Sequence, residues 1–229
     1  MKKRIITSFI ILITLLILLF GAYKLMNSRT YQLFGELTNR VETNQKIVAL
    51  TFDDGPTKNV EKTLPLLNKY NANATFFVIG TELEKNLKLG RAIVKSGHQL
   101  GNHTYSHNRM IFKTPSFMKE EIEKTNTFIR ATGYTDQIDF PPPNGKKLIG
   151  LPYYLNKHHI ETITWDLEPD TYYNSPSDKV NYVNKNGKPG SIILLHYDSE
   201  KYLQALEGIL DSLSKKGYQF VTVNELQKR

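Results

Sequence analysis

The sequence of 229 residues contains no cysteine. This absence excludes disulfide bonds, thiolate zinc sites, iron–sulfur clusters and cysteine nucleophiles, so any metal ion must bind to histidine, carboxylate or carbonyl groups. Hydrophobic residues make up 40% of the chain and charged residues 23%, a balance that excludes wholesale disorder. A chain of this length can bury one sizeable core but is too short for two ordinary domains and a linker.

The net charge of +8 is concentrated at the N-terminus. Residues 1–29 contain basic side chains and no acidic one and carry +5, which leaves +3 for the rest of the chain. Because most of the excess lies in this segment, the high isoelectric point does not indicate nucleic-acid binding. We expect no nucleic-acid partner, and no feature of the sequence implies a protein partner.

An apolar run follows a basic cluster at the start of the chain. Residues 5–23 carry no charge, and as a helix they would extend about 28 Å at ~1.5 Å per residue, close to the thickness of a hydrocarbon core. Lys2, Lys3 and Arg4 precede the run and predict that this end stays in the cytoplasm. We therefore expect a single-pass membrane anchor at residues 1–26, with the rest of the chain outside the cell. A cleaved signal peptide, which would leave a secreted protein, is the alternative.

The remaining chain divides into a polar segment and a patterned domain. Residues 27–43 are polar without a strong period, so we expect an extracellular tether. Residues 44–229 alternate between strand-like and helix-like runs, which predicts a parallel sheet with helices outside it. With about seven such units, the α/β class and a distorted or incomplete (β/α) barrel fit better than an open sheet. Strands are expected at 46–52, 74–79, 98–102, 160–165, 191–196 and 219–223, and helices at 60–70, 83–95, 115–132, 148–158, 201–216 and 224–228.

Barrels of this kind carry their chemistry where the strands end, so the polar residues that follow each strand should converge. Asp53 and Asp54 follow the first expected strand, although Asp-Gly turns are also common as solvated surface turns. His103 and His107 are four residues apart. On a helical turn both imidazoles would share one face with the spacing to grip a metal ion; a pair of surface histidines is the alternative. His196 ends an expected buried strand.

Two histidines and one aspartate would leave open positions on a bound metal ion such as Zn²⁺. Water on such an ion becomes far more acidic. A second aspartate could accept the proton, and a separate protonated histidine could donate one to the leaving group. The set fits hydrolysis of an amide or ester. The same ligands could hold Fe(II) for oxygenation, but the extra base and acid favour hydrolysis.

The motifs resemble, in their order, those of the polysaccharide deacetylases with a NodB-homology domain, carbohydrate esterase family four. The resemblance extends over about residues 44–227 and implies such a domain at 44–229. It also implies metal-dependent hydrolysis of N-acetyl groups from polysaccharides that contain GlcNAc or MurNAc, with cell-wall peptidoglycan as the expected substrate. The matching segments are Thr51-Phe52-Asp53-Asp54-Gly55-Pro56, Asn102-His103-Thr104-Tyr105-Ser106-His107, Leu194-Leu195-His196 and, for the family's second strand, residues 74–80.

The resemblance also implies a role for each motif residue. Asp54, His103 and His107 would bind a divalent metal ion, with Zn²⁺ expected and Co²⁺ as the alternative. Asp53 would be the general base and His196 the general acid. The metal would polarise the acetyl carbonyl while a backbone N–H helps to hold the oxyanion.

The third motif departs from the family pattern. Pro141 stands where the family has an arginine that pairs with the base aspartate and orients it. Proline cannot donate such a hydrogen bond, so we expect weakened rather than abolished activity, unless Lys146 or Lys147 replaces the arginine. The oxyanion donor of the family follows this proline turn, which points to the backbone N–H of Asn144, since the prolines before it have none.

The fourth motif also departs from the family, in which an aspartate after the strand tryptophan supports the acid histidine. Asp170 is expected in this role, with Asp166 as the second choice, and it would raise the pKa of His196. Trp165 is expected to fill the barrel. Aromatic rings beside the motifs could stack on sugar rings. The possible substrate contacts are Tyr105, Tyr172 and Tyr197.

Three functions fit this sequence. The leading hypothesis is an anchored enzyme that removes acetyl groups from N-acetylated polysaccharide beside the cell wall. A degenerate homologue that binds glycan or metal without turnover is the second, and Pro141 is its main support. An esterase for O-acetyl groups, as on xylan, is the third, because the same site can attack an ester.

Overall fold

The central strand, β2 (Ile47–Gly55), forms where an apolar run enters the Asp-Asp-Gly-Pro turn, and it is buried along nearly its whole length. It pairs in parallel with β3 (Thr75–Val78), β6 (Ile192–His196) and β7 (Gln219–Val221), and β3 pairs in parallel with β4 (Gln99–Asn102). Parallel pairing brings the carboxyl ends of β2, β3, β4 and β6 to one rim of the sheet.

The far side of the barrel is held by isolated contacts instead of continuous ladders. In the computed structural model, which describes residues 2–196 and 201–228, the short strands β1 (Leu37–Thr38) and β5 (Thr162–Ile163) pair with each other. Single parallel bridges then join Phe140 to β5 and Leu167 to β6. The expected distorted (β/α) barrel is therefore confirmed, with the strand expected at 160–165 reduced to β5.

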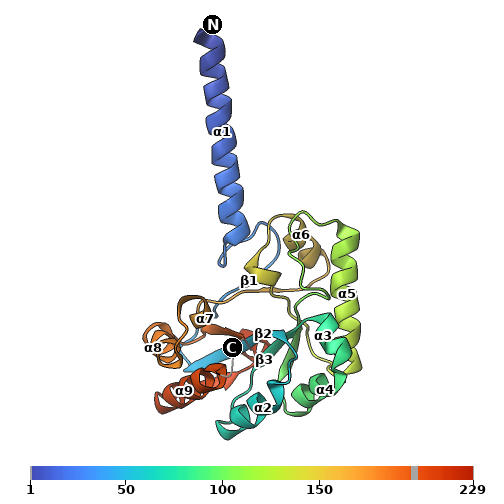
Figure 1. Ribbon diagram of the computed structural model, residues 1–229, viewed down its shortest axis with the longest axis vertical. Coiled ribbons are helices and arrows are strands. Elements are labelled where there is room, and N and C mark those ends of the chain that lie inside the picture. The colour runs from blue at the N-terminus through green and yellow to red at the C-terminus, as the bar shows by residue number, and fades with distance from the viewer. Residues whose placement is uncertain (1, 197–200, 229) are drawn as a thin grey trace.

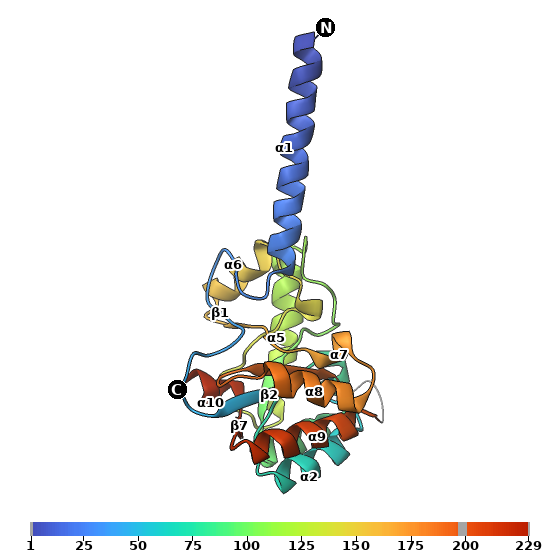
Figure 2. The same cartoon turned by 90° about the vertical axis from the view of Figure 1, so that its left-hand side faces the viewer.

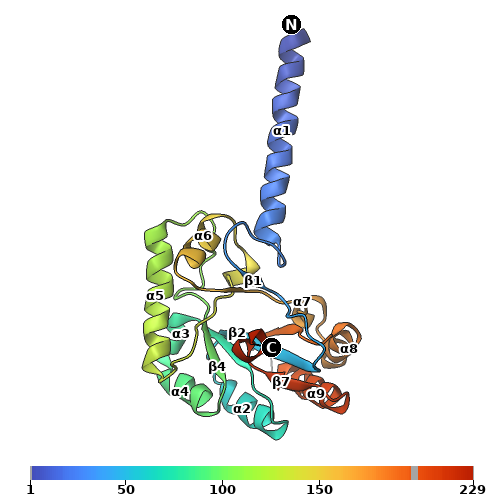
Figure 3. The ribbon, with the colours of Figure 1, turned by 180° about the vertical axis from the view of Figure 1, so that it is seen from behind.

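Helices cover the outside of the strands (Figures 1 and 3). The expected helix at 83–95 is broken at Asn86 into α3 and α4, and α7 and α8 occupy a stretch for which we expected no helix. The helices of the domain are α2 (Val60–Lys69), α3 (Gly80–Lys85), α4 (Leu87–Lys95), α5 (Pro115–Ala131), α6 (Gly150–Lys157), α7 (Pro169–Tyr172), α8 (Pro176–Asn186), α9 (Lys201–Lys215) and α10 (Val223–Gln227), with a 3-10 turn at Pro143–Gly145.

Alternation along β2 sorts its side chains into two cores. Val48, Leu50 and Phe52 pack in the main apolar cluster with residues of the covering helices. Ile47 and Ala49 belong to a second cluster that includes the tryptophan of the barrel interior. Because successive side chains of a strand point to opposite faces, the next odd-numbered residues of β2 also face the interior.

The N-terminal helix α1 (Lys2–Asn27) projects away from the domain, and none of its residues is buried (Figures 1 and 2). An 18-residue stretch of this helix has a mean hydropathy of 2.8, and with its length this would allow the helix to cross a membrane, a property that a signal sequence shares. Residues 27–43, which we expected to form a tether, instead lie along the domain. Leu37 pairs with Thr162, and the N–H of Val41 donates to the carbonyl of Gly190.

Candidate active site

Asp53 and Asp54 end the central strand at the functional rim. The alternation of β2 turns Asp53 into the barrel, where it is 3% exposed. Asp54 has a left-handed backbone with a φ of 66°, which turns its half-buried side chain towards the mouth of the barrel. Non-glycine residues adopt this conformation at a cost, and such residues cluster at functional sites.

His103 and His107 lie on a loop, so the expected helical turn is wrong. Thr104 and His107 have left-handed backbones, with φ values of 67° and 56°. The chain folds back between the two rings and brings their Nε2 atoms to 3.2 Å. Buried Glu121 holds the loop, because its carboxylate accepts hydrogen bonds from the N–H groups of Tyr105 and Ser106.

Asp54, His103 and His107 bring three possible ligand atoms within 4.8 Å of one another. Asp54 Oδ1 lies 3.5 Å from His103 Nε2 and 3.1 Å from His107 Nε2. His103 Nδ1 lies 3.0 Å from the carbonyl oxygen of Pro141, an arrangement that places the proton on Nδ1 and leaves the Nε2 lone pair for the site. Burial lowers the pKa of His103, so the ring is neutral at pH 7.

The chemistry of this donor set fits a divalent cation. Among residues 2–196 and 201–228, no group donates a hydrogen bond to the buried Oδ1 atom of Asp54. A buried carboxylate oxygen without a donor costs free energy, which a cation would offset. Two imidazoles and one carboxylate with space beside them are a typical arrangement for catalytic zinc.

Asp53 lies beside this donor set, with Oδ2 3.7 Å from His103 Nε2. Burial raises the pKa of Asp53 to about 8; the charge of His196 opposes this rise, and the charges of Asp54 and Glu168 add to it. No described residue donates a hydrogen bond to its Oδ1 atom. Asp53, the expected general base, therefore lacks the orienting partner that the family's arginine would supply.

The two lysines expected as replacements for that arginine point elsewhere. Lys146 Nζ donates to Asn27 Oδ1, and Lys147 Nζ donates to the carbonyl oxygen of Ser28. Lys146 thus holds the last residue of α1, and Lys147 holds the first residue after it. The expectation that one of them compensates for Pro141 is wrong.

His196 ends β6 and faces the same pocket. Its Nδ1 lies 3.3 Å from Asp170 Oδ2, and its backbone N–H donates to the same oxygen at 2.7 Å. Lys179 Nζ lies 2.6 Å from the other oxygen of Asp170. Burial alone would lower the pKa of His196, but Asp170 and Asp53 raise it to about 9. Asp166, the second choice for this role, instead binds backbone at the start of β6.

These side chains line one pocket of about 310 Å³. Asn144 lies on its wall with a φ of 55°, and its side-chain oxygen accepts a hydrogen bond from Arg109 Nε. Neither Arg29 nor Glu168 was among the expected site residues; Arg29 lies outside every motif, and Glu168 lies in the fourth motif between Asp166 and Asp170. The lining residues are Arg29, Asp53, Asp54, His103, His107, Asn144, Trp165, Glu168, Thr171, Leu194 and His196.

Neither of the two described tyrosines that were considered as substrate contacts lines this pocket. Tyr105 does not line the pocket, and its hydroxyl donates to Glu84 at 2.5 Å. Tyr172 does not line it either and packs against two neighbouring tyrosines. Tyr197 is outside the described residues. Trp165 both fills the barrel and forms part of the pocket wall.

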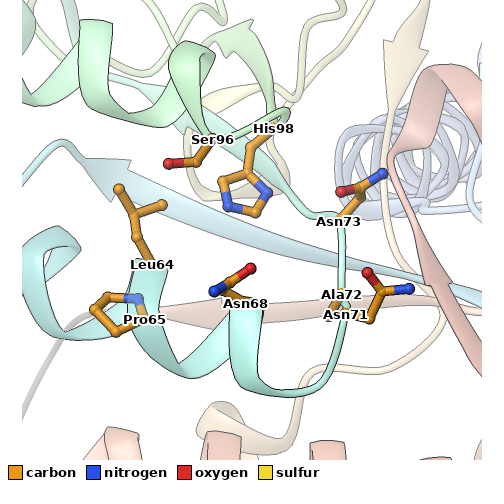
Figure 4. Close-up of a pocket in the computed structure, with 8 residues that line it drawn as sticks. All are labelled: Leu64, Pro65, Asn68, Asn71, Ala72, Asn73, Ser96 and His98. Carbon is orange, nitrogen blue, oxygen red and sulfur yellow. The ribbon is translucent and has the colours of Figure 1, made fainter.

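A larger cavity of about 540 Å³ lies at the amino ends of β3 and β4 (Figure 4). Asparagine side chains and His98 dominate its wall, and no carboxylate is among the lining residues. His98 Nδ1 accepts a hydrogen bond from the N–H of Ala74. Because this cavity offers neither an acid–base pair nor a cluster of metal ligands, it does not compete with the pocket at the carboxyl ends.

Comparisons with known proteins agree with this geometry. The sequence profile of the family described as polysaccharide deacetylase matches residues 40–172. The chain is 35% identical over 199 residues to a peptidoglycan-N-acetylglucosamine deacetylase of Bacillus cereus, which covers 84% of this chain and 93% of the relative. It is 37% identical over 192 residues to a bifunctional xylanase/deacetylase of Pseudobutyrivibrio xylanivorans, which covers 80% of this chain and 31% of the relative.

A solved structure shares the fold with a TM-score of 0.77 and 27% sequence identity, over 85% of this chain and 72% of the other. It is a mutant of BA3943, a CE4 family pseudoenzyme of Bacillus anthracis, with restored enzymatic activity.

Proposed function

Because the chain belongs to the polysaccharide deacetylase family, we propose that it removes N-acetyl groups from GlcNAc or MurNAc residues of peptidoglycan with a divalent metal ion, Zn²⁺ or alternatively Co²⁺. The observation that carries this proposal is the convergence, in one pocket, of the donor set Asp54, His103 and His107 with Asp53 and His196. The Bacillus cereus relative, a deacetylase of peptidoglycan N-acetylglucosamine, supports the substrate class.

In the proposed reaction, water cleaves the amide to acetate and a free amine. Asp54, His103 and His107 would hold the cation, which when bound supplies Lewis-acid activation of water and of the acetyl carbonyl. Asp53 would accept the proton of the attacking water in its carboxylate form; burial raises the pKa of Asp53, and the charges of His196 and of a bound cation would oppose that rise. His196, charged at neutral pH, donates a proton to the leaving amine.

The negative charge that develops on the acetyl oxygen needs a fixed donor. We assign this role to the backbone N–H of Asn144, whose residue lines the pocket. The 3-10 turn at Pro143–Gly145 and the hydrogen bond from Arg109 fix the position of this residue. A backbone donor that is already in place stabilises the transition state without reorganisation of the site.

Two other functions have specific support. Asp53 Oδ1 has no donor among the described residues, which fits a degenerate homologue that binds glycan without turnover. The similarity to the wild-type BA3943 pseudoenzyme also supports this function. The similarity to a bifunctional xylanase/deacetylase supports an esterase for acetylated xylan.

Acetate release by the full-length protein in detergent distinguishes these functions. We expect release from peptidoglycan and N-acetylglucosamine oligomers, loss of that release with a chelator, and recovery with Zn²⁺ or Co²⁺. Release from acetylated xylan alone would replace the amidase with an esterase. Stoichiometric metal without acetate from any of these substrates would establish the binding role.

Replacement of Pro141 tests the weakened third motif. We expect Pro141→Arg to raise kcat by about tenfold or more, because a hydrogen bond to a charged group contributes about 1.5–3 kcal/mol and Asp53 Oδ1 has no described donor. Pro141→Gln is the control, because it removes the proline ring without adding a charge. Zinc content should stay constant, since the backbone carbonyl that binds His103 remains. Equal acetate release by the wild type and Pro141→Arg would refute this account of the motif.

The proposed location is the outer face of the cell membrane, with α1 as the anchor. Outside α1, Phe34, Phe112 and Tyr153 are among the exposed large apolar side chains, and Tyr153 of α6 lines an apolar groove together with Lys113 and Lys157. Figures 2 and 3 show α6 level with the last turn of α1. Because the chain has no cysteine, a single cysteine in place of Phe112 should react with an impermeant maleimide on intact cells. Reaction only after permeabilisation would reverse the orientation.

A further inference from the structure

Arg29 enters the catalytic pocket from the segment that follows α1, two residues beyond the end of the helix. Its Nη2 lies 2.5 Å from Glu168 Oε2, and its guanidinium carbon lies 4.5 Å from the centre of the Trp165 ring. Glu168 Oε2 also accepts a hydrogen bond from Trp165 Nε1 at 2.9 Å. The three side chains therefore form a closed set in which each one fixes the other two.

The backbone around Arg29 is held from two sides of the pocket. Thr164 Oγ1 donates to the carbonyl oxygen of Arg29 at 2.6 Å. Lys147 donates its N–H to the carbonyl of Met26 at 3.2 Å and its Nζ to the carbonyl of Ser28. Lys147 follows the proline turn, and Thr164 precedes the pocket tryptophan. The segment 26–29 thus joins two walls of the pocket.

The positive charge of Arg29 stabilises the buried carboxylate of Glu168. Glu168 is only 8% exposed and lines the same pocket as Asp53 and Asp54. A buried carboxylate among other acids is unfavourable unless a cation pairs with it. Arginine suits this place because its planar guanidinium can stack on an aromatic face while its edge pairs with a carboxylate. A lysine could supply the charge but not the flat stacking surface.

We propose that Arg29 is a positioning residue of the deacetylase site, which holds Trp165 and Glu168 as one fixed wall against which the acetylated sugar binds. The inference rests on the proposed function for the identity of the ligand. It makes the segment that leaves the membrane helix part of the binding pocket, so the shape of the pocket depends on residues outside the motifs of the family.

The chain contains one tryptophan, so Trp165 fluorescence reports this contact directly and independently of turnover. We expect Arg29→Ala, in the full-length protein, to shift the emission maximum to longer wavelength and to increase quenching by acrylamide. We expect KM for N-acetylglucosamine oligomers to rise about tenfold, the scale of one lost charged hydrogen bond, while kcat changes less than about twofold. Arg29→Lys should bring KM part of the way back to the wild-type value, and most of the shift in the emission maximum should remain.

Arg40→Ala is the matched control, because Arg40 lies on the same segment, pairs with Glu42 and does not line the pocket. It should leave emission and KM unchanged. Unchanged emission in Arg29→Ala would overturn the proposed contact, and shifted emission with unchanged KM would overturn the positioning role.

If the wild type releases no acetate from any glycan, the proposed function is refuted, but the positioning role of Arg29 can still be tested. In that case N-acetylglucosamine oligomers are titrated into the protein, and their binding to the wall of the pocket is followed by Trp165 fluorescence. Weaker binding by Arg29→Ala than by Arg40→Ala would support the positioning role, and equal binding would refute it.

Discussion

Asp54→Asn is expected to lose bound zinc and to lower kcat/KM for acetate release by more than about a hundredfold, because removal of groups that merely support metal ligands already costs about 10–100-fold. Asp54 Oδ1 is the only carboxylate oxygen in the cluster of three possible ligands among the described residues. Two neutral histidines alone bind a divalent cation weakly in competition with water. The substitution removes the negative charge while it keeps the size of the side chain.

Asparagine is the better replacement because of the backbone at this position. Asp54 has a φ of 66°, and asparagine tolerates that left-handed conformation whereas alanine does not. The melting temperature should therefore change little, and Asp136→Asn, at an exposed carboxylate, is a control for the chemistry of the substitution. Elemental analysis of the purified protein measures zinc directly. Full zinc occupancy and normal acetate release in Asp54→Asn would exclude the proposed ligand set.

The sequence predicted that the motif acids and histidines converge at one rim of the sheet, because short-range rules determine where each of them lies relative to its strand. Because an apolar strand leads directly into the Asp-Asp-Gly-Pro turn, the two aspartates must lie at the carboxyl end of that strand. The four-residue spacing of His103 and His107 also predicted their pairing. The helical turn was wrong because Thr104 and His107 take left-handed backbones, and hydrogen bonds from the N–H groups of the loop to the side chains of Asn102, Glu121 and Thr104 hold it in that shape.

The remaining features depend on contacts between distant segments. Arg29 and Glu168 are 139 positions apart, and no local pattern predicts that they meet. A polar stretch such as 27–43 is typical of a tether. Its backbone nevertheless donates and accepts hydrogen bonds along the domain. Similarly, only the fold shows that Lys146 and Lys147 bind this segment and leave Asp53 without a new partner.

Replacement of His196 is expected to have the second large effect. His196→Gln should lower kcat by about 10²–10⁴-fold, the usual contribution of a positioned general acid. The metal content should stay normal, because His196 is outside the cluster of ligand atoms. This separation of metal content from activity distinguishes an acid catalyst from a ligand. Loss of zinc together with activity would contradict the assigned role.

The pH dependence follows from the pair of His196 and Asp170. The pKa of His196 is raised from 6.5 to about 9, so the donor form prevails at neutral pH and is lost as the pH rises. The alkaline limb of kcat should therefore have its midpoint at or below pH about 9, since a bound cation can only lower this pKa. The stabilisation of the fold that comes from the raised pKa of His196 is present in full below pH 6.5, as long as Asp170 stays ionised, and disappears as the pH rises through about 9.

Asp170→Asn should move that alkaline limb to lower pH, because the imidazolium loses the carboxylate that stabilises it. The substitution also leaves Lys179, which is 5% exposed, without its partner, so the single variant should be less stable. The double variant Asp170→Asn/Lys179→Met removes the unpaired charge and should recover stability while the shifted limb persists. An alkaline limb that stays in place in the folded double variant would show that Asp170 does not set the pKa of the general acid. Recovery of stability without recovery of the limb would establish that Asp170 acts on catalysis through His196 and not through the integrity of the fold.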